Sequence, residues 1–296
     1  WQGALQVPLG TFDPAAVLDL IEKHRINITL GVPSMLAAIA EEQHANPRDV
    51  SSLEALIHGG SPIATEVVRR SCSAFPTTQL IEVYGATETS PLVALLGNEE
   101  NLMDDPLARS CGRAVMGCSV SIKDADGTEL ARGEVGEVVV SGTNIMAGYW
   151  NKPEQTAAVL KHGGYYTGDM GYLDDDGYLF LVDRSKDMIV SGGENVYSTE
   201  VEEVLYRHPA VLEAAVFGVP DDKWGEAVYA VIVPRPENAE VQPEELIAFC
   251  REHIGGYKVP KGIDIQHEPL PKSGPGKVLK RELRAPYWEG TDRAVN

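Results

Sequence analysis

The stretches Leu53-Glu-Ala-Leu-Ile-His-Gly-Gly60 and Gln79-Leu-Ile-Glu-Val-Tyr-Gly85 decide the predicted fold, because each is an apolar run that ends at glycine. Both runs have the length of a buried strand, and Ala64–Ser73 between them has the spacing of a helix. Further upstream, Asp13-Pro14 has the form of a helix N-cap followed by proline, and a second helical pattern starts at Pro33. Strands that alternate with helices predict a parallel α/β sheet.

The sequence changes in character twice beyond this sheet. Short strands separated by turns at Asp126-Gly127 and Asp176-Gly177 predict a small antiparallel sheet or barrel. After Lys186, helices and strands alternate again over enough chain for an independent small α+β domain. We therefore expect a large-domain part at 1–185, α/β over 1–114 and β-rich over 115–185, followed by a mobile C-terminal α+β domain at 186–296.

Composition excludes several classes of protein. Of the 296 residues, 43% are hydrophobic, which is enough for packed cores and rules out a disordered or fibrous chain. The formal net charge of −19 disfavours nucleic acid as a partner. No run of about 18 apolar residues is present, so we expect no transmembrane segment. Four cysteines without CxxC spacing or close histidines predict reduced core thiols in a cytoplasmic protein.

The loop that follows the second strand carries four side-chain types suited to a nucleotide. It lies at the edge where parallel α/β sheets bind ligands. Gly85 lets the backbone approach a ligand closely, and Tyr84 offers a flat face to a base. Thr87 offers a hydroxyl to a phosphoryl group, and Glu88 offers a hard oxygen ligand to Mg²⁺. Taken alone, the loop is more typical of an ordinary strand-to-loop turn.

Two further stretches lie where the predicted β-rich part ends. In Tyr165-Tyr-Thr-Gly-Asp169, an aspartate after glycine can accept both vicinal hydroxyls of a ribose; the alternative is an Asx-type turn. In the stretch from Asp183 to Asn195, a strand ends, charged residues follow, and a glycine pair comes next. This order is typical of a hinge between domains, although a plain hairpin connection would have the same form.

A basic island lies near the C-terminal end of this acidic chain. The stretch from Gly255 to Arg284 carries seven Lys and Arg residues against three Asp and Glu residues. Such an island suggests a small polyanion such as a nucleotide phosphate, although charge alone is more typical of a solvated basic face. Within it, Pro271-Lys-Ser-Gly-Pro-Gly-Lys277 presents a lysine on a loop. The loop does not match the Walker pattern, because Val278 follows Lys277.

The order and spacing of these motifs resemble the adenylate-forming superfamily, which contains acyl-CoA synthetases, peptide-synthetase adenylation domains and firefly-type luciferases. The resemblance covers nearly the whole chain. The matching stretches are Leu53–Pro62, Tyr84–Glu88, Gly133–Glu137, Gly148–Pro153, Tyr166–Asp169, Arg184–Glu200, Trp224–Glu226 and Pro271–Lys277. Gly192-Gly-Glu-Asn-Val-Tyr197 and Gly148-Tyr-Trp-Asn-Lys-Pro153 look most like fatty-acid or aryl-acid CoA ligases.

The resemblance implies an ATP-dependent acid–CoA ligase. Such an enzyme joins a fatty or aryl carboxylic acid to AMP and then transfers the acyl group to CoA, so that ATP or AMP, Mg²⁺ and CoA are the expected cofactors. The implied fold is the later part of a large AMP-binding domain, with a parallel α/β sheet and a small barrel-like subdomain, followed by a mobile α+β domain. By position, Gly60, Ser61 and Tyr84 would line the adenine, Gly85 would belong to the same cofactor-binding set, and Thr87 would contact the α-phosphate.

The remaining implied roles concern metal, ribose and catalysis. Glu88 would hold Mg²⁺, and Asp169 would bind the ribose hydroxyls with the assistance of Arg184. Lys277 would bridge the attacking carboxylate and the AMP phosphate, so that Lys277, Thr87 and Glu88 form the implied catalytic set.

The resemblance also implies a moving domain. Lys186 would be the hinge about which the small domain rotates, and Gly193 would lie near the pantetheine channel. Rotation would withdraw the catalytic lysine after adenylation and bring the glycine-lined channel to the same carbonyl for thioester formation.

One part of the family pattern is missing from this sequence. The phosphate-binding loop, rich in Ser, Thr and Gly and ending in Pro-Lys-Gly, precedes the region that corresponds to Trp1, so the chain resembles the C-terminal three-fifths of such an enzyme. We therefore expect a complementing N-terminal segment, and a homodimer is a further possibility. The alternatives are an adenylation domain that loads a carrier protein, an inactive nucleotide-binding fragment, or one half of a split enzyme.

Overall fold

A computed structural model describes residues 3–61, 63–97, 106–273 and 277–289. Its contacts define two compact units, each treated separately below. The first comprises residues 1–119, 142–148 and 176–179, and the second comprises 120–141, 149–175 and 180–296. The predicted boundary between residues 185 and 186 lies inside the second unit and stays a prediction.

The first unit contains the predicted α/β sheet, whose strand order is β1-β2-β3-β4-β5. The strands are β1 (Ile28–Gly31), β2 (Ala55–Gly59), β3 (Gln79–Tyr84), β4 (Ala94–Leu96) and β5 (Arg113–Ala114). Strands β1, β2 and β3 are parallel, as predicted. Strands β4 and β5 extend the sheet in antiparallel pairing and were not predicted, because runs of three and two residues show no periodicity.

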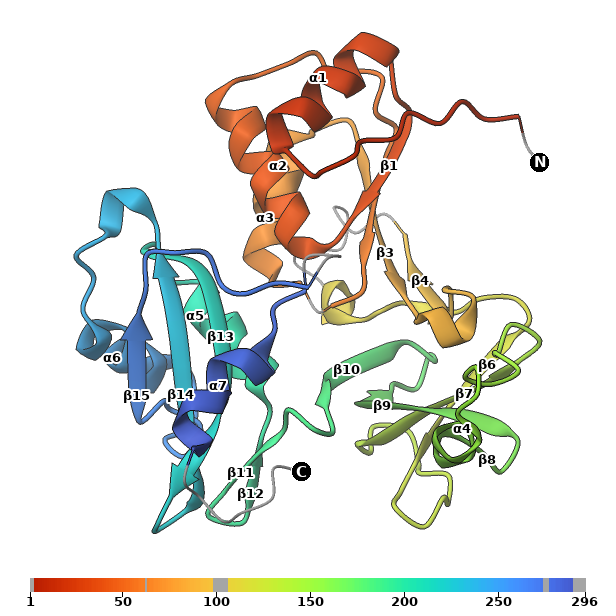
Figure 1. Cartoon of the computed structure of the whole chain (residues 1–296), viewed down its shortest axis with the longest axis vertical. Coiled ribbons are helices and arrows are strands. Elements are labelled where there is room, and N and C mark those ends of the chain that lie inside the picture. Colours follow the sequence, from red (N-terminus) through yellow and green to blue (C-terminus); the bar gives the residue numbers. More distant parts are fainter. Residues whose placement is uncertain (1–2, 62, 98–105, 274–276, 290–296) are drawn as a thin grey trace. The chain divides into compact units, whose positions relative to one another are not determined.

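Three helices cover one face of this sheet (Figure 1). They are α1 (Pro14–His24), α2 (Pro33–Ala45) and α3 (Thr65–Ala74). The Asp13 side chain accepts a hydrogen bond from Ala16 N at 2.8 Å, which confirms the predicted N-cap of α1. The core between the helices and the sheet includes Leu56 and Leu80 of the strands, exposed by 1% and 0%.

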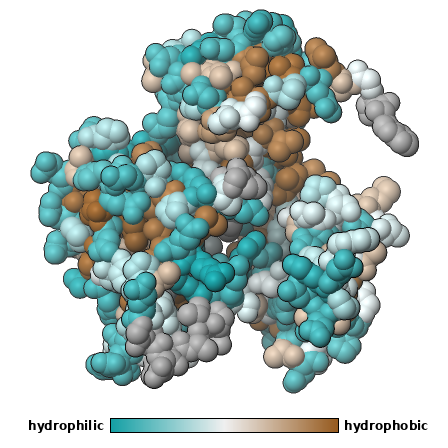
Figure 2. Space-filling model, viewed as in Figure 1, coloured by the Kyte–Doolittle hydropathy of each residue, from teal (hydrophilic) through white to brown (hydrophobic). Residues whose placement is uncertain are grey.

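The opposite face of the same sheet is apolar but exposed at β1. The register places Leu30, Ile57 and Ile81 in one row on this face. Leu30 is 79% exposed and Ile28 is 59% exposed. Figure 2 shows apolar residues gathered over the part of this unit where β1 and β3 run. Parallel sheets are normally covered on both faces, so this face differs from the usual arrangement.

The predicted β-rich part forms a second sheet with the order β10-β9-β7-β6, and β8 pairs with β9. The elements are β6 (Cys118–Lys123), β7 (Gly136–Gly142), α4 (Pro153–Val159), β8 (Leu160–Lys161), β9 (Gly164–Leu173) and β10 (Leu179–Arg184). Gly127 and Gly177 have φ of +84° and +82°, as the predicted Asp-Gly turns require.

The C-terminal part forms a third sheet with the order β12-β11-β14-β13, and β15 pairs with β14. Its elements are β11 (Ile189–Ser191), β12 (Glu194–Val196), α5 (Ser198–Tyr206), β13 (Val211–Asp221), β14 (Gly225–Pro234), α6 (Pro243–His253), β15 (Gly262–Ile265) and α7 (Lys280–Trp288). Three short 3₁₀ helices complete the described structure of the chain: η1 (Thr87–Thr89), η3 (Pro106–Arg109) and η4 (Pro236–Asn238).

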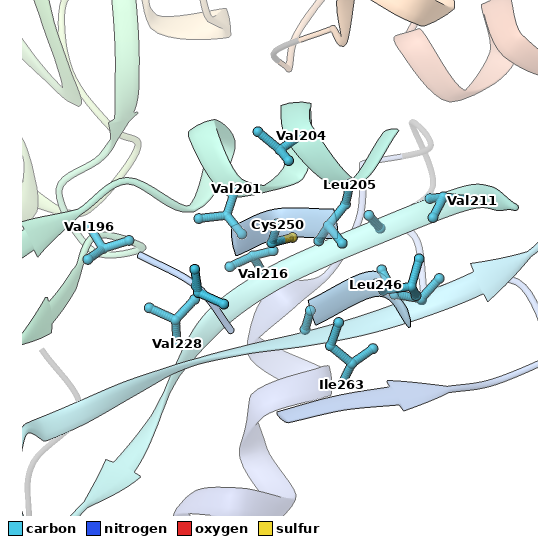
Figure 3. Close-up of a cluster of buried hydrophobic side chains, with 14 of the residues drawn as sticks. Val196, Val201, Val204, Leu205, Val211, Val216, Val228, Leu246, Cys250 and Ile263 are labelled. Carbon is cyan, nitrogen blue, oxygen red and sulfur yellow. The ribbon is translucent and has the colours of Figure 1, made fainter. Parts of the chain in front are cut away.

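Both faces of this third sheet are buried. One core joins α5, α6 and alternate strand residues such as Val216 and Ile232 (Figure 3). The other core places Phe217 and Val231, from the intervening positions, against Tyr287 of α7. The alternation explains how one pair of long strands supports two cores.

The remaining expectations from composition concern thiols and membranes. All four cysteines are thiols, and burial raises the pKa of Cys250 to about 11. None of the helices in the described ranges has both the length and the apolar character needed to cross a membrane.

Candidate functional site

The predicted site residues fall into two groups, one in each unit. The first unit holds the loops after β2 and β3, and the second holds the Asp169 turn, the predicted hinge and the Lys277 loop. Each group is described by itself.

Strands β2 and β3 bring the first group to one edge. Because Gly59 pairs with Val83 in parallel register, Gly60 and Ser61 leave the sheet beside Tyr84. A Cβ atom on Gly59 would lie 2.1 Å from the carbonyl oxygen of Val83, so glycine is needed for the two strand ends to approach this closely. The two loops therefore lie side by side, and their proximity rests on a backbone contact.

The loop after β3 turns tightly. A Cβ atom on Gly85 would lie 1.7 Å from the carbonyl oxygen of Pro91, so this glycine is required by the packing of the loop itself. The next residues form η1, where the Thr89 hydroxyl donates to Ala86 O and accepts from Ala86 N, both at 2.9 Å. Thr87 is exposed and Glu88 is half-buried on this turn, where a ligand can reach them.

Asn144, which sequence reasoning missed, holds this turn in place. Its side-chain amide donates to Thr89 O at 2.8 Å and to Leu92 O at 3.1 Å. The Ser90 hydroxyl donates to Asn144 O at 2.9 Å, and Met146 N donates to Glu88 O at 2.8 Å. The segment 142–148 is therefore a strap across the Thr87–Glu88 turn. No local signal marks Asn144, because its partners lie more than 50 residues away.

The donor set around Glu88 bears on the expected Mg²⁺. Across the described ranges, no three histidine, cysteine, aspartate or glutamate side chains gather as a metal site. Mg²⁺ in nucleotide sites is commonly held by one or two carboxylates together with substrate phosphates and water. A half-buried Glu88 beside the exposed Thr87 fits that second arrangement.

Asp169 projects from a bulge in β9. The pairing of β9 with β7 places Thr167, Gly168 and Asp169 opposite the single residue Val138. The Thr167 hydroxyl donates to Val138 O at 2.8 Å and accepts from Asp169 N at 3.0 Å. Gly168 has φ of +75°, and its N–H donates to the Glu137 carboxylate at 3.0 Å. Bulges re-aim side chains, and this one directs the Asp169 carboxylate out of the ladder.

Arg184 pairs with Asp169, the two residues that the resemblance assigns to the ribose, and that role stays a prediction. Arg184 Nε lies 3.3 Å from Asp169 Oδ1. The pair is held because β10 ends at Arg184, and Ser185 N donates to Gly168 O at 2.9 Å. The Asp169 side chain is 18% exposed, so its carboxylate is oriented and still accessible.

The predicted hinge residue Lys186 lies exposed in a tight turn. Asp187 N and Met188 N both donate to Arg184 O at 3.0 Å. Gly193 follows in the turn between β11 and β12, with φ of +87° and open space around the position of an added Cβ. The stretch from Asp183 to Asn195 thus contains a tight turn and a hairpin, and the role of Lys186 as a hinge stays a prediction.

The Gly192 side of this hairpin packs on Trp224. A Cβ atom on Gly192 would lie 2.7 Å from the indole, and Gly192 N donates to Trp224 O at 2.8 Å. The hairpin that carries Gly193 is thereby fixed on one side and open on the other.

Lys277 lies on a short hairpin. Ser273 N donates to Lys277 O at 2.8 Å, and Lys277 N donates to the Ser273 hydroxyl at 3.1 Å. The backbones of Lys272 and Val278 form an antiparallel β-bridge. The Gly-Pro-Gly part of the predicted loop, 274–276, and Pro62 of the first group lie outside the described residues.

The fold combines an α/β part, whose loops carry the first group of predicted site residues, with a β-rich sheet and a small α+β part that carry the second group. Residues 3–150 match the model of the AMP-binding enzyme family, and residues 200–277 match that of the AMP-binding enzyme C-terminal domain. The chain belongs to the AMP-binding enzyme family, which confirms the resemblance.

Three relatives illustrate the range of activities in the family. Medium/long-chain-fatty-acid–CoA ligase FadD8 of Mycobacterium tuberculosis is 40% identical, over 99% of this chain and 52% of that protein. A feruloyl-CoA synthase of an Amycolatopsis species is 40% identical, over 96% and 56%. Fatty acid–[acyl-carrier-protein] ligase ScoC of Streptomyces coeruleorubidus is 35% identical, over 99% and 56%. The chain spans about half the length of these relatives.

Solved structures confirm the fold of adenylate-forming enzymes. The amide bond synthetase McbA from Marinactinospora thermotolerans is 38% identical with a TM-score of 0.84, over 93% of this chain and 55% of that one. The o-succinylbenzoate CoA synthetase MenE from Bacillus subtilis, in complex with the acyl-adenylate intermediate OSB-AMP, is 33% identical with a TM-score of 0.78, over 96% and 55%.

Proposed function

We propose that the chain is part of an ATP-dependent acid–CoA ligase. In the first step, the carboxylate of a fatty or aryl acid attacks the α-phosphate of ATP, and pyrophosphate leaves. In the second step, the thiol of CoA attacks the carbonyl of the acyl-adenylate, and AMP leaves. The cytoplasmic location and the homodimer stay predictions.

The residues divide this chemistry between them. Gly60, Ser61 and Tyr84 line the adenine, and Thr87 and Glu88 serve the α-phosphate and Mg²⁺. In the first step charge develops between two anions, so a cation placed there stabilises the transition state more than the ground state. Lys277 supplies that cation, and the turn at Lys186 allows the small domain to move for the second step.

The observation that carries the proposal is the Asp169–Arg184 pair. A bulge aims an accessible carboxylate, and the arginine holds it at 3.3 Å. AMP should therefore bind even without the family's phosphate loop, because the proposed residues contact the base and the ribose and not the terminal phosphates of ATP. Calorimetry with AMP at millimolar concentration tests this, and Asp169→Ala should weaken binding by about 1.5–3 kcal/mol, as for a hydrogen bond to a charged group. A folded protein that does not bind AMP would contradict the proposal.

A complementing polypeptide, equivalent to the part of the relatives that this chain does not span, completes the enzyme. The support is the exposed apolar sheet face with Ile28 and Leu30, together with coverage of about half of each relative. The unspanned part of the Amycolatopsis feruloyl-CoA synthase is a concrete probe. Leu30→Asp should weaken its binding by roughly 30-fold or more, because an unpaired carboxylate would be buried. Leu5→Asp, at a residue 83% exposed and outside the strands, is the control.

A carrier-protein ligase is the second candidate, because ScoC is 35% identical over 99% of this chain. The two candidates share the adenylation step and differ in the thiol of the second step. Incubation of the complemented enzyme with the acyl-adenylate and either CoA or a phosphopantetheinylated carrier separates them. Faster transfer to the carrier would replace the CoA-ligase proposal, and transfer to neither would favour the inactive fragment.

A further inference from the structure

We infer that Lys272 and Lys280 are positioning residues, which anchor the two arms of the Lys277 hairpin to carboxylates of the C-terminal domain. The inference rests on the proposed function, in which Lys277 is the cation of the adenylation step. The hairpin is closed by the Lys272–Val278 bridge and by Leu279 N, which donates to Pro271 O at 2.8 Å. Its two ends are therefore the points at which its position can be fixed.

The second arm leads directly into Lys280, the first residue of α7. Its ammonium lies 2.7 Å from a carboxylate oxygen of Glu202 and donates to the Ser198 hydroxyl at 2.7 Å. Both charged side chains are largely buried, with 17% and 16% of their surfaces exposed. A buried pair of this geometry is held far more rigidly than an exposed ion pair, because breaking it would leave an uncompensated charge.

Glu202 is itself fixed by the sheet. It lies on α5, which packs on β13, and its carboxylate accepts a hydrogen bond from Val216 N of β13 at 2.8 Å. Lys280 thus connects the end of the hairpin to helix α5 and to strand β13 at once. Lys277 lies three residues before Lys280, so this side chain ties one end of the hairpin to the core of the domain.

The first arm has an anchor of the same kind on the same strand. The Lys272 ammonium pairs with the carboxylate of Glu213 on β13. The other oxygen of Glu213 accepts a hydrogen bond from Leu270 N at 2.9 Å. Each arm therefore ends in a lysine that faces a carboxylate. The carboxylate of Glu213 belongs to β13, and that of Glu202 accepts a hydrogen bond from β13.

The Lys280 anchor also reaches the predicted hinge. Ser198, whose hydroxyl contacts Lys280, donates its backbone N–H to the Asp183 carboxylate, and Asp183 is 6% exposed. Asp183 lies three residues before Lys186, and its other oxygen accepts from Arg184 N at 2.7 Å. One buried cluster consequently connects the hairpin with the segment that leads into the hinge.

The experiment compares Lys280→Met with Lys280→Arg and with Arg281→Met, an exposed neighbour of equal charge. Hydrogen exchange of the chain alone measures the anchor directly. Lys280→Met should raise exchange at the amides of residues 272, 273 and 277–279 about tenfold or more while β13 keeps its protection. Arg281→Met should change neither. A Lys280→Met/Glu202→Gln variant removes both charges and keeps the comparison interpretable if the single variant unfolds.

Half-reactions of the complemented enzyme measure the functional consequence. Lys280→Met should slow adenylation by about 10- to 100-fold through misplacement of Lys277, with little change in the KM for the acid. Thioester formation from a supplied acyl-adenylate should stay within about twofold of the original, since that step does not use Lys277. Lys280→Arg should restore most of the adenylation rate.

Unchanged exchange at residues 272, 273 and 277–279, or an equal fall in both half-reactions, would overturn the inference. A complemented wild type that forms no acyl-adenylate would count against the proposed function alone, because the exchange measurement still decides whether Lys280 anchors the hairpin.

Discussion

The first and third sheets of the chain differ in what covers them. In the third sheet, β13 and β14 bury alternate residues in two cores, one against α5 and α6 and one against α7. In the first sheet, helices cover one face, while the other face leaves Leu30 79% exposed. The C-terminal domain thus has a complete core of its own, whereas the α/β part presents an apolar face suited to another layer.

The same two regions hold their site residues by different means. The Thr87–Glu88 turn is held by uncharged hydrogen bonds from Asn144 and by close glycine contacts. The Lys277 hairpin is held by lysine–carboxylate pairs. The stability of the Thr87–Glu88 turn should therefore not depend on the protonation of its anchoring groups. The stability of the Lys277 hairpin depends on the protonation and the burial of its lysines and carboxylates.

The largest expected effect comes from truncating one leucine in each region, Leu205 of helix α5 and Leu30 of strand β1. Leu205→Ala removes a fully buried side chain from the core of Figure 3 and should cost about 2–5 kcal/mol. Leu30→Ala removes an exposed side chain and should stay within about 0.5 kcal/mol. Denaturant unfolding of both variants, with hydrogen exchange to assign each transition to its region, provides the measurement. A cost at Leu30 that matched the cost at Leu205 would mean that the first sheet is already covered.

Sequence predicted those parts of both regions that depend on local pattern. The N-cap at Asp13 and the parallel strands follow from periodicity and end signals. The Asp169–Arg184 pair was predicted only through the family resemblance, since its geometry depends on the bulge in β9.

Residues whose roles come from distant contacts gave no such signal. Asn144 lies 55 residues from Thr89, and Lys280 lies 82 residues from Ser198. An asparagine in a loop and a lysine in a basic run are typical of solvated surface, so only the fold distinguishes them. Short antiparallel strands such as β4 were missed for a related reason, because pairing with β3 and not their own pattern defines them.

A smaller effect should follow from breaking the strap across the Thr87–Glu88 turn. Asn144→Ala removes donors to two backbone carbonyls and should cost about 1–3 kcal/mol. Asn144→Asp keeps the shape and should be at least as harmful, because a carboxylate cannot donate to carbonyl oxygens. Thr143→Ala, at the exposed neighbouring residue, is the control. Thermal unfolding gives the cost. If the Asp variant were as stable as the original protein, the uncharged strap would not hold this region.

The smallest effect at neutral pH, and the sharpest contrast between the regions, is the dependence of stability on pH. Burial is the main cause that raises the pKa of Glu202, with Lys280 opposing it and Asp183 adding to it. Hydrogen bonds from Ser51 are the main cause that lowers the pKa of Asp49 in the first unit, next to Arg25 at 3.0 Å. Folding therefore strengthens proton binding by Glu202 and weakens proton binding by Asp49.

The signs follow from linkage. A raised folded pKa means that the contribution of Glu202 is full below its unfolded pKa and is lost as pH rises through the folded value. A lowered folded pKa means that the contribution of Asp49 is present above its unfolded pKa and is lost as pH falls through the folded value. We expect the free energy of unfolding of the wild type, relative to Glu202→Gln, to rise as pH falls toward about 4.5, near the ordinary glutamate pKa. Relative to Asp49→Asn, it should fall as pH drops below about 4. Urea unfolding of the three proteins from pH 3.5 to pH 7 measures both differences. If both differences in the free energy of unfolding changed with pH in the same direction, the cluster of Glu202, Lys280 and Asp183 would not be a desolvated charge network. The contrast between the two regions would then fail.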